Sequence, residues 1–246
     1  MRVLSRIRKV TPLPGADIPS LPRPTVGHVL AGAQCCSRPE LSDDQGKHTC
    51  ADTVQPCIRV YFDGADGTGK THMAHRVSQD YQIPMIDEGA RLILSVRRVN
   101  TFDGVRADSS LSSEFQATVL QHQLDEEARY KPPYVADRTL GNLAYARSHA
   151  RNFADLWESV PASYLADLRQ SVVFLVRPQR ALRQAAAQDS GRALSDWDAQ
   201  VRIDETVGTM FKLWRVPYVT VDMPGAAERD EFVDWCLEAR GFRRVE

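Results

Sequence analysis

The sequence predicts an α/β fold of three layers, in which a parallel five-stranded sheet is covered by helices on both faces. Two observations predict it. From Ile58 onward, short β-rich runs alternate with segments of helical length and periodicity. The first run ends in a glycine-rich segment, residues 64–71, that lies between a strand and a helix. Strands that alternate with helices imply right-handed crossovers and therefore a parallel sheet.

Five short apolar runs are expected to form this sheet. The strands of a parallel sheet are buried on both faces, so they appear in a sequence as nearly continuous apolar runs. Pro84 weakens the second run, because proline cannot donate a hydrogen bond to a neighbouring strand. We predict strands at residues 58–62, 83–86, 134–136, 171–176 and 216–221.

The segments between these runs carry apolar residues at helical spacing. In the longest one, Phe115, Val119, Leu120 and Leu124 lie at the spacing of one helix face. We predict helices at residues 71–79, 112–129, 180–188, 197–214 and 228–240. We also expect four aromatic side chains to lie in the core rather than to form a platform for stacking a base: Phe115, Trp197, Phe211 and Trp214.

Residues 1–57 differ in composition from the rest of the chain. They hold seven of the fourteen prolines and no aromatic residue. Such a segment can bury little apolar surface, so we expect it to be extended or without stable structure. We therefore divide the chain into a proline-rich N-terminal extension, residues 1–57, and a catalytic domain, residues 58–246.

Composition excludes several classes of protein. The formal net charge of −1 argues against a generally basic surface that coats nucleic acid, although a local basic groove stays open. No run approaches the roughly 18 to 20 apolar residues that cross a bilayer. The N-terminus is basic but lacks the apolar core of a secretory signal, whereas a transit peptide stays open. Five cysteines without paired spacing fit neither a disulfide framework nor a usual zinc site. We expect a cytoplasmic protein.

The glycine-rich segment has the composition of a phosphate-binding P-loop. Its glycines allow backbone N–H groups to turn inward around phosphate oxygens, and the following helix favours the anion at its N-terminus. Lys70 is expected on the β- and γ-phosphates of ATP, and the Thr71 hydroxyl on Mg²⁺. A chance match in a glycine-containing turn is the alternative. The expected ATP-binding residues are Gly64, Ala65, Asp66, Gly67, Thr68, Gly69, Lys70 and Thr71.

A P-loop alone does not distinguish a kinase from a GTPase or a motor ATPase. The sequence has no Asn-Lys-x-Asp guanine signature and no second large domain that could couple hydrolysis to motion. Residues 58–246 have the size of a small-substrate kinase. We therefore expect the P-loop NTPase fold and an ATP-dependent phosphotransferase that uses ATP and Mg²⁺.

Three segments resemble the thymidylate kinase family. Phe62-Asp63-Gly64-Ala65-Asp66-Gly67-Thr68-Gly69-Lys70-Thr71 is similar to that family's Phe-Glu-Gly-x-Asp-Gly-x-Gly-Lys-Thr. Asp137-Arg138-Thr139, followed by Leu143-Ala144-Tyr145, resembles its Asp-Arg-Tyr segment with the trailing Leu-Ala-Tyr. Residues 173–182 look like the strand and turn that lead into its lid. The resemblance spans most of residues 58–240, in the family's order, and implies a nucleoside or nucleotide kinase.

Asp87-Glu88-Gly89-Ala90-Arg91 departs from that family, which carries Arg-Glu-Pro-Gly at this point. This segment looks closer to deoxynucleoside kinases and to nicotinamide-riboside-kinase-like P-loop proteins. In those enzymes a glutamate acts as base toward an acceptor hydroxyl. The resemblance therefore implies that Glu88 is a catalytic base and that Arg91 binds the acceptor. A solvated loop glutamate is the alternative for Glu88.

The remaining candidates follow strands or flank the expected lid. Asp137 ends an apolar strand, where a carboxylate can hold Mg²⁺ directly or through water; a helix N-cap is its alternative. Arg138 is expected on the acceptor or on the transferred phosphate, with a surface ion pair as the alternative. Asp66 is expected to contact the acceptor or only to shape the loop. The candidate lid residues are Arg180, Arg183 and Arg192.

Three functions remain open from the sequence. The first is an ATP-dependent kinase for a pyrimidine-deoxynucleoside-type acceptor. The second is the activity of a bacteriophage branch of thymidylate-kinase-like enzymes, which phosphorylate 5-hydroxymethyluracil within DNA; a hydroxyl-activating Glu88 would suit it. The third is a nicotinamide-riboside-kinase-like enzyme or a regulatory ATPase. The expected partners are accordingly a nucleoside or nucleotide, or modified DNA, with no membrane; a homodimer stays open.

Overall fold

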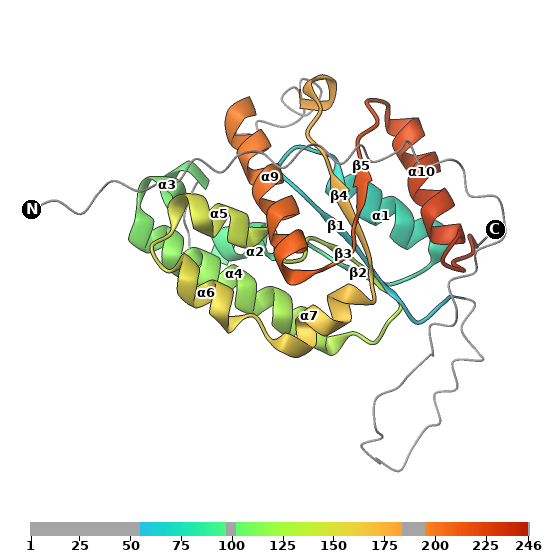
Figure 1. The fold of residues 1–246 in the computed structure, drawn as a ribbon, viewed down its shortest axis with the longest axis horizontal. Helices are drawn as coiled ribbons and strands as arrows, with labels where there is room; N and C mark the ends of the chain where they lie inside the picture. Colours follow the sequence, from blue (N-terminus) through green and yellow to red (C-terminus); the bar gives the residue numbers. More distant parts are fainter. Residues whose placement is uncertain (1–54, 97–101, 184–194, 246) are drawn as a thin grey trace, which may run out of the picture. The chain divides into compact units, whose positions relative to one another are not determined.

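Five parallel strands in the order β2-β3-β1-β4-β5 form the sheet (Figure 1). The computed structural model describes residues 55–96, 102–183 and 195–245. Residues 1–54, most of the predicted extension, lie outside the described residues. The strand order and the parallel pairing confirm the five-stranded parallel sheet that the sequence predicts. The strands are β1 (Arg59–Asp63), β2 (Met85–Ile86), β3 (Tyr134–Asp137), β4 (Val172–Val176) and β5 (Val219–Val221).

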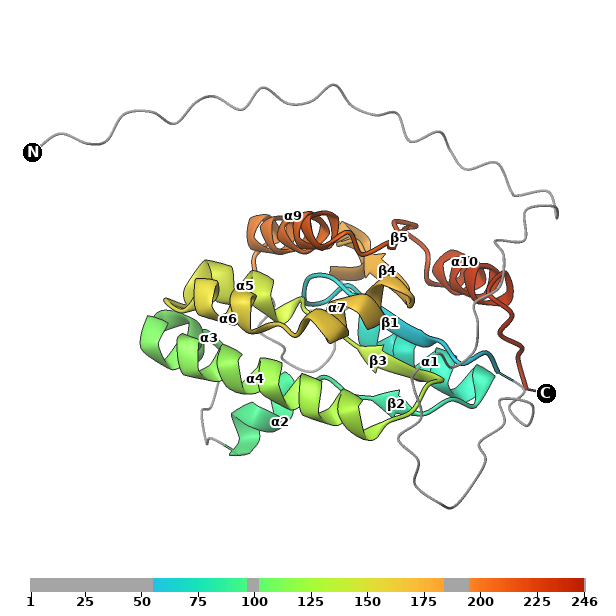
Figure 2. The same cartoon turned by 60° about the horizontal axis from the view of Figure 1, so that its bottom comes forward.

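The two faces of the sheet bury separate sets of side chains. In β1, Val60 and Phe62 belong to one apolar cluster and Tyr61 to the other, as expected when successive side chains point to opposite faces. The cluster with Val60 lies under α1 (Lys70–Tyr81) and α10 (Ala226–Glu238). The cluster with Tyr61 packs against helices on the other face, which Figures 1 and 2 show on the opposite side of the sheet: α4 (Ser109–Arg129), α5 (Asn142–His149), α6 (Phe153–Ser159), α7 (Ala162–Arg169) and α9 (Trp197–Trp214).

Two further short helices, α2 (Gly89–Val96) and α3 (Phe102–Ala107), pack on the long helix α4. They form a third, smaller cluster of apolar side chains with it, centred on Phe115 and Val119. Neither helix was predicted, nor were α5, α6 and α7. All five have six to eight residues, a length at which tertiary packing rather than helix propensity decides whether a helix forms.

The predicted helices are present, but some of their ends differ. Helix α4 begins at Ser109 rather than at residue 112, because the Asp108 carboxylate accepts hydrogen bonds from Ser110 N and Leu111 N. Helix α9 begins as predicted, after an equivalent cap by Asp196. Of the helix predicted over residues 180–188, the described part, residues 180–183, is helical.

Three of the four aromatic residues that we expected in the core are buried there: Phe115, Phe211 and Trp214. Trp197 is the exception and corrects the prediction. It is the first residue of α9 and only partly buried, and the Arg180 guanidinium lies 4.7 Å from its ring centre. A cation over an aromatic face is favourable, so Trp197 holds an arginine instead of filling the core.

Gln55 and Cys57, which we assigned to the N-terminal extension, contact the catalytic domain. The Gln55 amide donates to Tyr81 O at 2.8 Å, and its oxygen accepts from Arg243 N at 2.9 Å. The Cys57 thiol lies 3.5 Å from Pro132 O. The backbone preceding β1 therefore packs on the domain a few residues earlier than the predicted boundary at residue 58.

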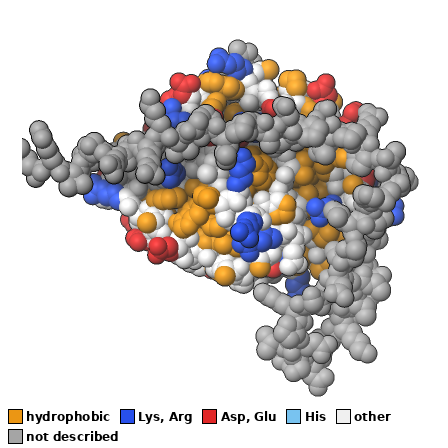
Figure 3. Space-filling model, in the orientation of Figure 1, with side chains coloured by type: hydrophobic (Ala, Val, Ile, Leu, Met, Phe, Trp, Pro, Cys, Tyr) orange, Lys and Arg blue, Asp and Glu red, His pale blue; other side chains and the backbone are white. Residues whose placement is uncertain are grey.

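Two of our expectations concern the described part of the chain and its surface: one about membrane-spanning segments and one about a homodimer. None of the helices in this part of the chain is long and apolar enough to cross a membrane. On the face that carries α9, hydrophobic side chains gather among a few basic ones (Figure 3), and Leu213 of α9 is 67% exposed. Exposed apolar groups of this kind are common at subunit contacts. The homodimer stays a prediction.

Candidate active site

The candidate residues lie at the carboxyl ends of three neighbouring strands. The P-loop follows β1, Arg138 follows β3, and Glu88 comes two residues after β2. Because these strands are parallel and adjacent, their carboxyl ends meet at one edge of the sheet. Ligands of open α/β sheets bind at this edge. The fold thus brings together residues that are far apart in the sequence.

The P-loop backbone depends on its glycines. Gly64, Gly67 and Gly69 have φ angles of 134°, 70° and 92°, which side chains rarely adopt. A Cβ atom on Gly64 would also lie 2.5 Å from Val176 O of the neighbouring strand β4. Within the loop, the Thr68 hydroxyl donates to Ala65 O at 3.1 Å. The segment is therefore a tight loop that leads directly into α1.

Lys70 is the first residue of α1 and turns back over the loop. Its ammonium group donates to Ala65 O and to Thr68 Oγ1, and only 4% of the residue is exposed. Burial, followed by repulsion from Arg138, lowers the pKa of Lys70 to about 8, although Asp137, Glu88 and Asp63 oppose this shift. A buried cation without a carboxylate in direct contact is well suited to receive phosphate oxygens.

ATP binding is expected to weaken as the pH rises above about 8. The phosphates of ATP stabilise the protonated Lys70, so above its pKa of about 8 the free protein must take up a proton to bind. The apparent Kd should increase up to about tenfold per pH unit there. Calorimetric titrations across this range measure the effect. In the Lys70→Arg variant, whose guanidinium stays charged, this pH dependence should disappear. An unchanged pH dependence in that variant would contradict the assignment.

Thr71 and Asp137 face each other where a metal ion of the nucleotide is expected. The Thr71 hydroxyl donates to Asp137 Oδ2 at 2.5 Å, and Asp137 Oδ1 is buried without a hydrogen-bond partner among the described residues. Burial, then repulsion from Glu88, raises the pKa of Asp137. A divalent cation would relieve both the unpaired oxygen and the buried charge. These two oxygen donors therefore fit Mg²⁺, which prefers carboxylate, hydroxyl and water ligands.

Arg138 connects the P-loop with Glu88. Its Nε donates to Glu88 Oε1 at 2.5 Å, a terminal nitrogen donates to Gly64 O at 3.0 Å, and the guanidinium lies 5.3 Å from the Tyr145 ring centre. Burial lowers the pKa of Arg138, but Glu88 and other nearby acidic groups raise it by more than burial lowers it. The net pKa lies well above the ordinary value for arginine, so Arg138 stays charged. Its backbone φ of 96° is strained for a bulky residue, a feature that clusters at functional sites.

Asp63, the last residue of β1, organises both loops, a role that we did not predict. Its carboxylate accepts from Gly64 N at 2.7 Å and, on the loop after β3, from Gly141 N at 3.0 Å and from both N and Oγ1 of Thr139. Asp63 is fully buried. A carboxylate at the end of an apolar strand directly before a P-loop glycine is the sequence signal that marks it.

Asp66 is occupied by contacts within the protein. Tyr145 OH donates to its Oδ1 at 3.1 Å, and Ser195 N donates to its Oδ2 at 2.8 Å. Its own carbonyl accepts from Gln200 at 2.9 Å. Burial raises the pKa of Asp66, but the Ser195 hydrogen bond and nearby cations lower it more. The geometry favours the loop-shaping alternative. For Arg91, which was also predicted to bind the acceptor, the side chain lies outside what the structure describes.

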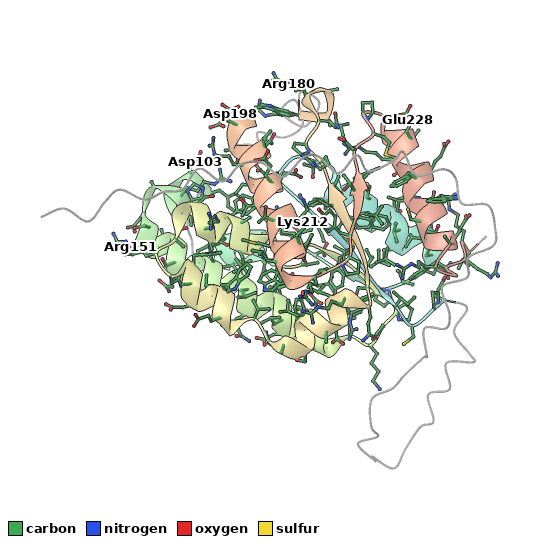
Figure 4. All side chains as sticks on the ribbon, in the orientation of Figure 1. Asp103, Arg151, Arg180, Asp198, Lys212 and Glu228 are labelled. Carbon is green, nitrogen blue, oxygen red and sulfur yellow. The ribbon has the colours of Figure 1, made fainter. Side chains whose placement is uncertain are left out.

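The three candidate lid arginines differ in what the structure shows of their contacts. Arg183 donates to Ser195 O at 3.0 Å, next to the residue that binds Asp66, and its Nε is buried with no partner among the described residues. Arg180 instead stacks on Trp197, at the end of the molecule where Figure 4 shows it near Asp198. Arg192 lies outside the described residues. Of the two lid candidates that the structure describes, Arg183 is thus the one linked to the P-loop, through Ser195 and Asp66.

A cavity of about 210 Å³ opens beside residues 67–69 of the P-loop. His72 and Met73 of α1, Leu182, and Ala226 of α10 contribute to its walls. Arg229, which we did not predict, also lines it and donates to Thr68 O at 2.8 Å, Met223 O at 2.5 Å and Arg177 O at 3.2 Å. Since all three acceptors are backbone carbonyls, this arginine fixes the loops around the cavity.

Solved structures of two kinds of protein share this fold. A NadR protein in complex with NR has a TM-score of 0.60 at 18% identity, over 77% of this chain and 53% of that chain. Deoxyadenosine kinase from M. mycoides, with products dCMP and dCDP, has a TM-score of 0.57 at 14% identity, over 74% of this chain and 100% of that chain. The chain spans about half of the NadR chains it matches. At these identities the likeness shows a P-loop kinase-like fold.

The sequence comparisons place the chain in a family. A search of the curated proteins finds no match. The model of a family described as "AAA domain" matches residues 59–229, which is more than half of the 246 residues. That range begins with β1 and includes the P-loop, Asp137, Arg138 and the buried Arg229. The chain therefore belongs to this AAA-domain family.

Proposed function

We propose that the protein is an ATP-dependent kinase that transfers the γ-phosphate of ATP to a hydroxyl of a pyrimidine-deoxynucleoside-type acceptor. One observation carries the proposal: the ion pair between Glu88 and Arg138 lies against the P-loop, since Arg138 also donates to Gly64 O. A carboxylate at this place can accept the proton of a hydroxyl that attacks the γ-phosphate. A kinase needs one where the acceptor hydroxyl meets the phosphate.

On the donor side, positioning and charge do most of the work. The P-loop amides and Lys70 hold the β- and γ-phosphates. Thr71 and Asp137 would hold Mg²⁺, which neutralises phosphate charge when bound. The cavity beside residues 67–69 takes the base of ATP, with Arg229 fixing the loops around it. Arg183, whose Nε is buried without a partner among the described residues, is the arginine that we assign to the phosphates from the lid side.

On the acceptor side, Glu88 accepts the proton of the attacking hydroxyl, and Arg138 orients that carboxylate. A general base must lie within hydrogen-bond reach of the proton that it abstracts. The Arg138 guanidinium also offers its positive charge to the phosphoryl group as that group moves toward the acceptor.

Replacing Glu88 by Gln is expected to lower kcat by about 10²- to 10⁴-fold without changing the KM for ATP. The amide oxygen of Gln can still accept from Arg138 Nε, so the site keeps its shape and loses only the base. Steady-state kinetics with saturating acceptor measure the effect. The neighbouring Asp87, whose side chain is 77% exposed, supplies the control Asp87→Asn. A Glu88→Gln enzyme as fast as the Asp87→Asn control would remove Glu88 from the mechanism.

The proposal is tested by incubating the full chain with labelled ATP, Mg²⁺ and a panel of deoxynucleosides and their monophosphates. Label in at least one of them is the expected result. Absence of label from every acceptor would refute a free-metabolite kinase.

A DNA base is the second candidate acceptor. It is favoured by Glu88, which suits a hydroxyl acceptor, and by the missing Arg-Glu-Pro-Gly segment. DNA that contains 5-hydroxymethyluracil is incubated with labelled ATP and then digested to nucleosides. Label in the 5-hydroxymethyl-2′-deoxyuridine released from the DNA would support this function. If the nucleosides released by the digestion carry no label, this function is excluded. Rapid ATP hydrolysis that no acceptor changes would instead favour a regulatory ATPase, and label in nicotinamide riboside a kinase of that kind.

A further inference from the structure

The face of α4 that points toward the sheet and α5 carries an unusual set of buried polar side chains. They recur at helical spacing, at positions 112, 116, 123 and 127. Two of them, Gln123 and Glu127, make side-chain hydrogen bonds with described residues. Glu127 accepts from Tyr61, Tyr134 and Tyr164 and from Gln123, and Gln123 also lies 3.4 Å from Arg138 O. In this half of the helix, Gln123 and Glu127 form a hydrogen-bond network with three tyrosines, and the network extends to the backbone carbonyl of Arg138.

The other half of the same face is different. Ser112 is 1% exposed and Gln116 8% exposed, yet Ser112 Oγ and Gln116 Oε1 have no hydrogen-bond partner among the described residues. Buried polar groups without partners cost stability, so native proteins keep few of them and usually for a reason. The network around Glu127 shows that this helix can satisfy buried polar groups elsewhere along its length.

Two hydrogen bonds between α4 and the segments on either side of α5 show where Ser112 and Gln116 lie relative to the active site. At one end, Asn152, just after α5, donates to Ser113 O at 3.3 Å. At the other end, Gln123 contacts Arg138 O, just before α5. Helix α5 therefore runs alongside this stretch of α4, and Gln116 lies about 10 Å along the helix from Gln123. Tyr145 of α5, whose ring faces both Arg138 and Arg106, belongs to the same stretch.

We propose that Ser112 and Gln116 form the recognition subsite for the acceptor, and that they bind a planar group with an N–H donor next to a carbonyl or ring-nitrogen acceptor. The inference rests on the proposed function and assigns to it the part of the acceptor that does not react. A glutamine amide offers one donor and one acceptor side by side, so it pairs with such an edge through two hydrogen bonds. The Ser112 hydroxyl adds one more.

This chemistry is shared by the edge of a pyrimidine base and by a carboxamide. Both place an N–H beside an oxygen or nitrogen acceptor in one plane. A base within a DNA duplex could reach these buried groups only after leaving the stack. The hydroxyl to be phosphorylated then lies at Glu88, and the hydrogen-bonding edge lies deeper, along α4.

The test measures equilibrium binding of thymidine, N3-methylthymidine, deoxycytidine and nicotinamide riboside to the full chain without ATP. Without ATP the readout does not depend on phosphate transfer. The variants are Gln116→Leu and, as control, Gln121→Leu. Gln121 is on the exposed side of the same helix, where its amide donates to Asp125 Oδ1 at 2.8 Å. Thermal unfolding of the ligand-free proteins is measured in parallel.

We expect at least one probe to bind the wild type and to bind Gln116→Leu about 10- to 100-fold more weakly. If that probe is thymidine, its preference over N3-methylthymidine should vanish in the variant. Because leucine removes an unpaired polar group, ligand-free Gln116→Leu should melt about 2–4 °C higher than the wild type. Gln121→Leu should bind like the wild type.

Equal binding to the wild type and Gln116→Leu would overturn the inference, and so would the absence of binding by any probe. A lower melting temperature with unchanged binding would assign Gln116 to the fold instead. Failure of the proposed function looks different: a probe binds through Gln116, but labelled ATP transfers no phosphate to it. Thymidine and nicotinamide riboside, as separate arms, distinguish a base from a carboxamide.

Discussion

Lys70→Ala is expected to lower phosphate transfer by about a thousandfold or more, while the fold stays intact. Lys70 is the P-loop cation that we expect on the β- and γ-phosphates, and among the described residues its ammonium group donates to Ala65 O and Thr68 Oγ1. Its pKa is lowered to about 8 from 10.5, so the folded state disfavours the charged form at neutral pH. Removing it should therefore leave the melting temperature unchanged or raise it.

Transfer of labelled phosphate and thermal unfolding with and without MgATP measure the two parts of this prediction. The wild type should gain stability from MgATP, and Lys70→Ala should gain much less, because a ligand stabilises only as far as it binds the native state. Lys212→Ala is the matched control. Lys212 is exposed near the C-terminal end of α9, whereas Asp198 lies at the start of that helix, near Arg180 (Figure 4). Transfer at the wild-type rate by Lys70→Ala would exclude the P-loop as the donor site.

The sheet could be predicted from sequence because its signals are local. A buried parallel strand is a run of apolar residues, and β4 (Val172–Val176) is buried throughout. The short helices α2, α3 and α5 to α7 could not be predicted in the same way. Their existence depends on packing against α4 and α9, and that information is spread over the whole chain.

The donor half of the site follows the same rule. Glycines, Lys70 and Thr71 are contiguous, so one segment of sequence indicates a complete phosphate loop. Arg229 is 161 residues from its acceptor on Thr68 and could only be found in three dimensions. Asp66 shows the converse: its place in the motif suggested the acceptor, and its contacts with Tyr145 and Ser195 favour shaping the loop.

The acceptor half of the site depends on which strands are neighbours. Glu88 and Arg138 are 50 residues apart, and the strand order β2-β3-β1 brings them together beside the P-loop. Resemblance to thymidylate kinases suggested Arg138, whereas Glu88 came from the segment that departs from them and looks closer to deoxynucleoside kinases. The comparisons with known proteins extend to an AAA domain and a P-loop kinase-like fold, so the thymidylate-like acceptor remains a proposal.

Asp63→Ala is expected to lower the free energy of unfolding by about 3 kcal/mol. The carboxylate is fully buried and accepts from Gly64, Thr139 and Gly141. Without it, four donors on two loops lose their partner in a place where few waters can replace it. Its negative charge also favours the charged forms of Lys70 and Arg138, so both cations would be less well compensated. Denaturant titration measures the loss.

Because Asp63 joins the P-loop to the loop that carries Arg138, its removal should lower transfer as well as stability. Asp103→Ala is the control, since the Asp103 side chain is 67% exposed on α3 and only pairs loosely with Arg106. Transfer is compared at a temperature where both variants are folded, which separates displaced loops from unfolded protein. If Asp63→Ala unfolds at the same denaturant concentration as Asp103→Ala, the two loops are held by other contacts. If it is less stable but transfers phosphate normally, the loops keep their catalytic positions without it.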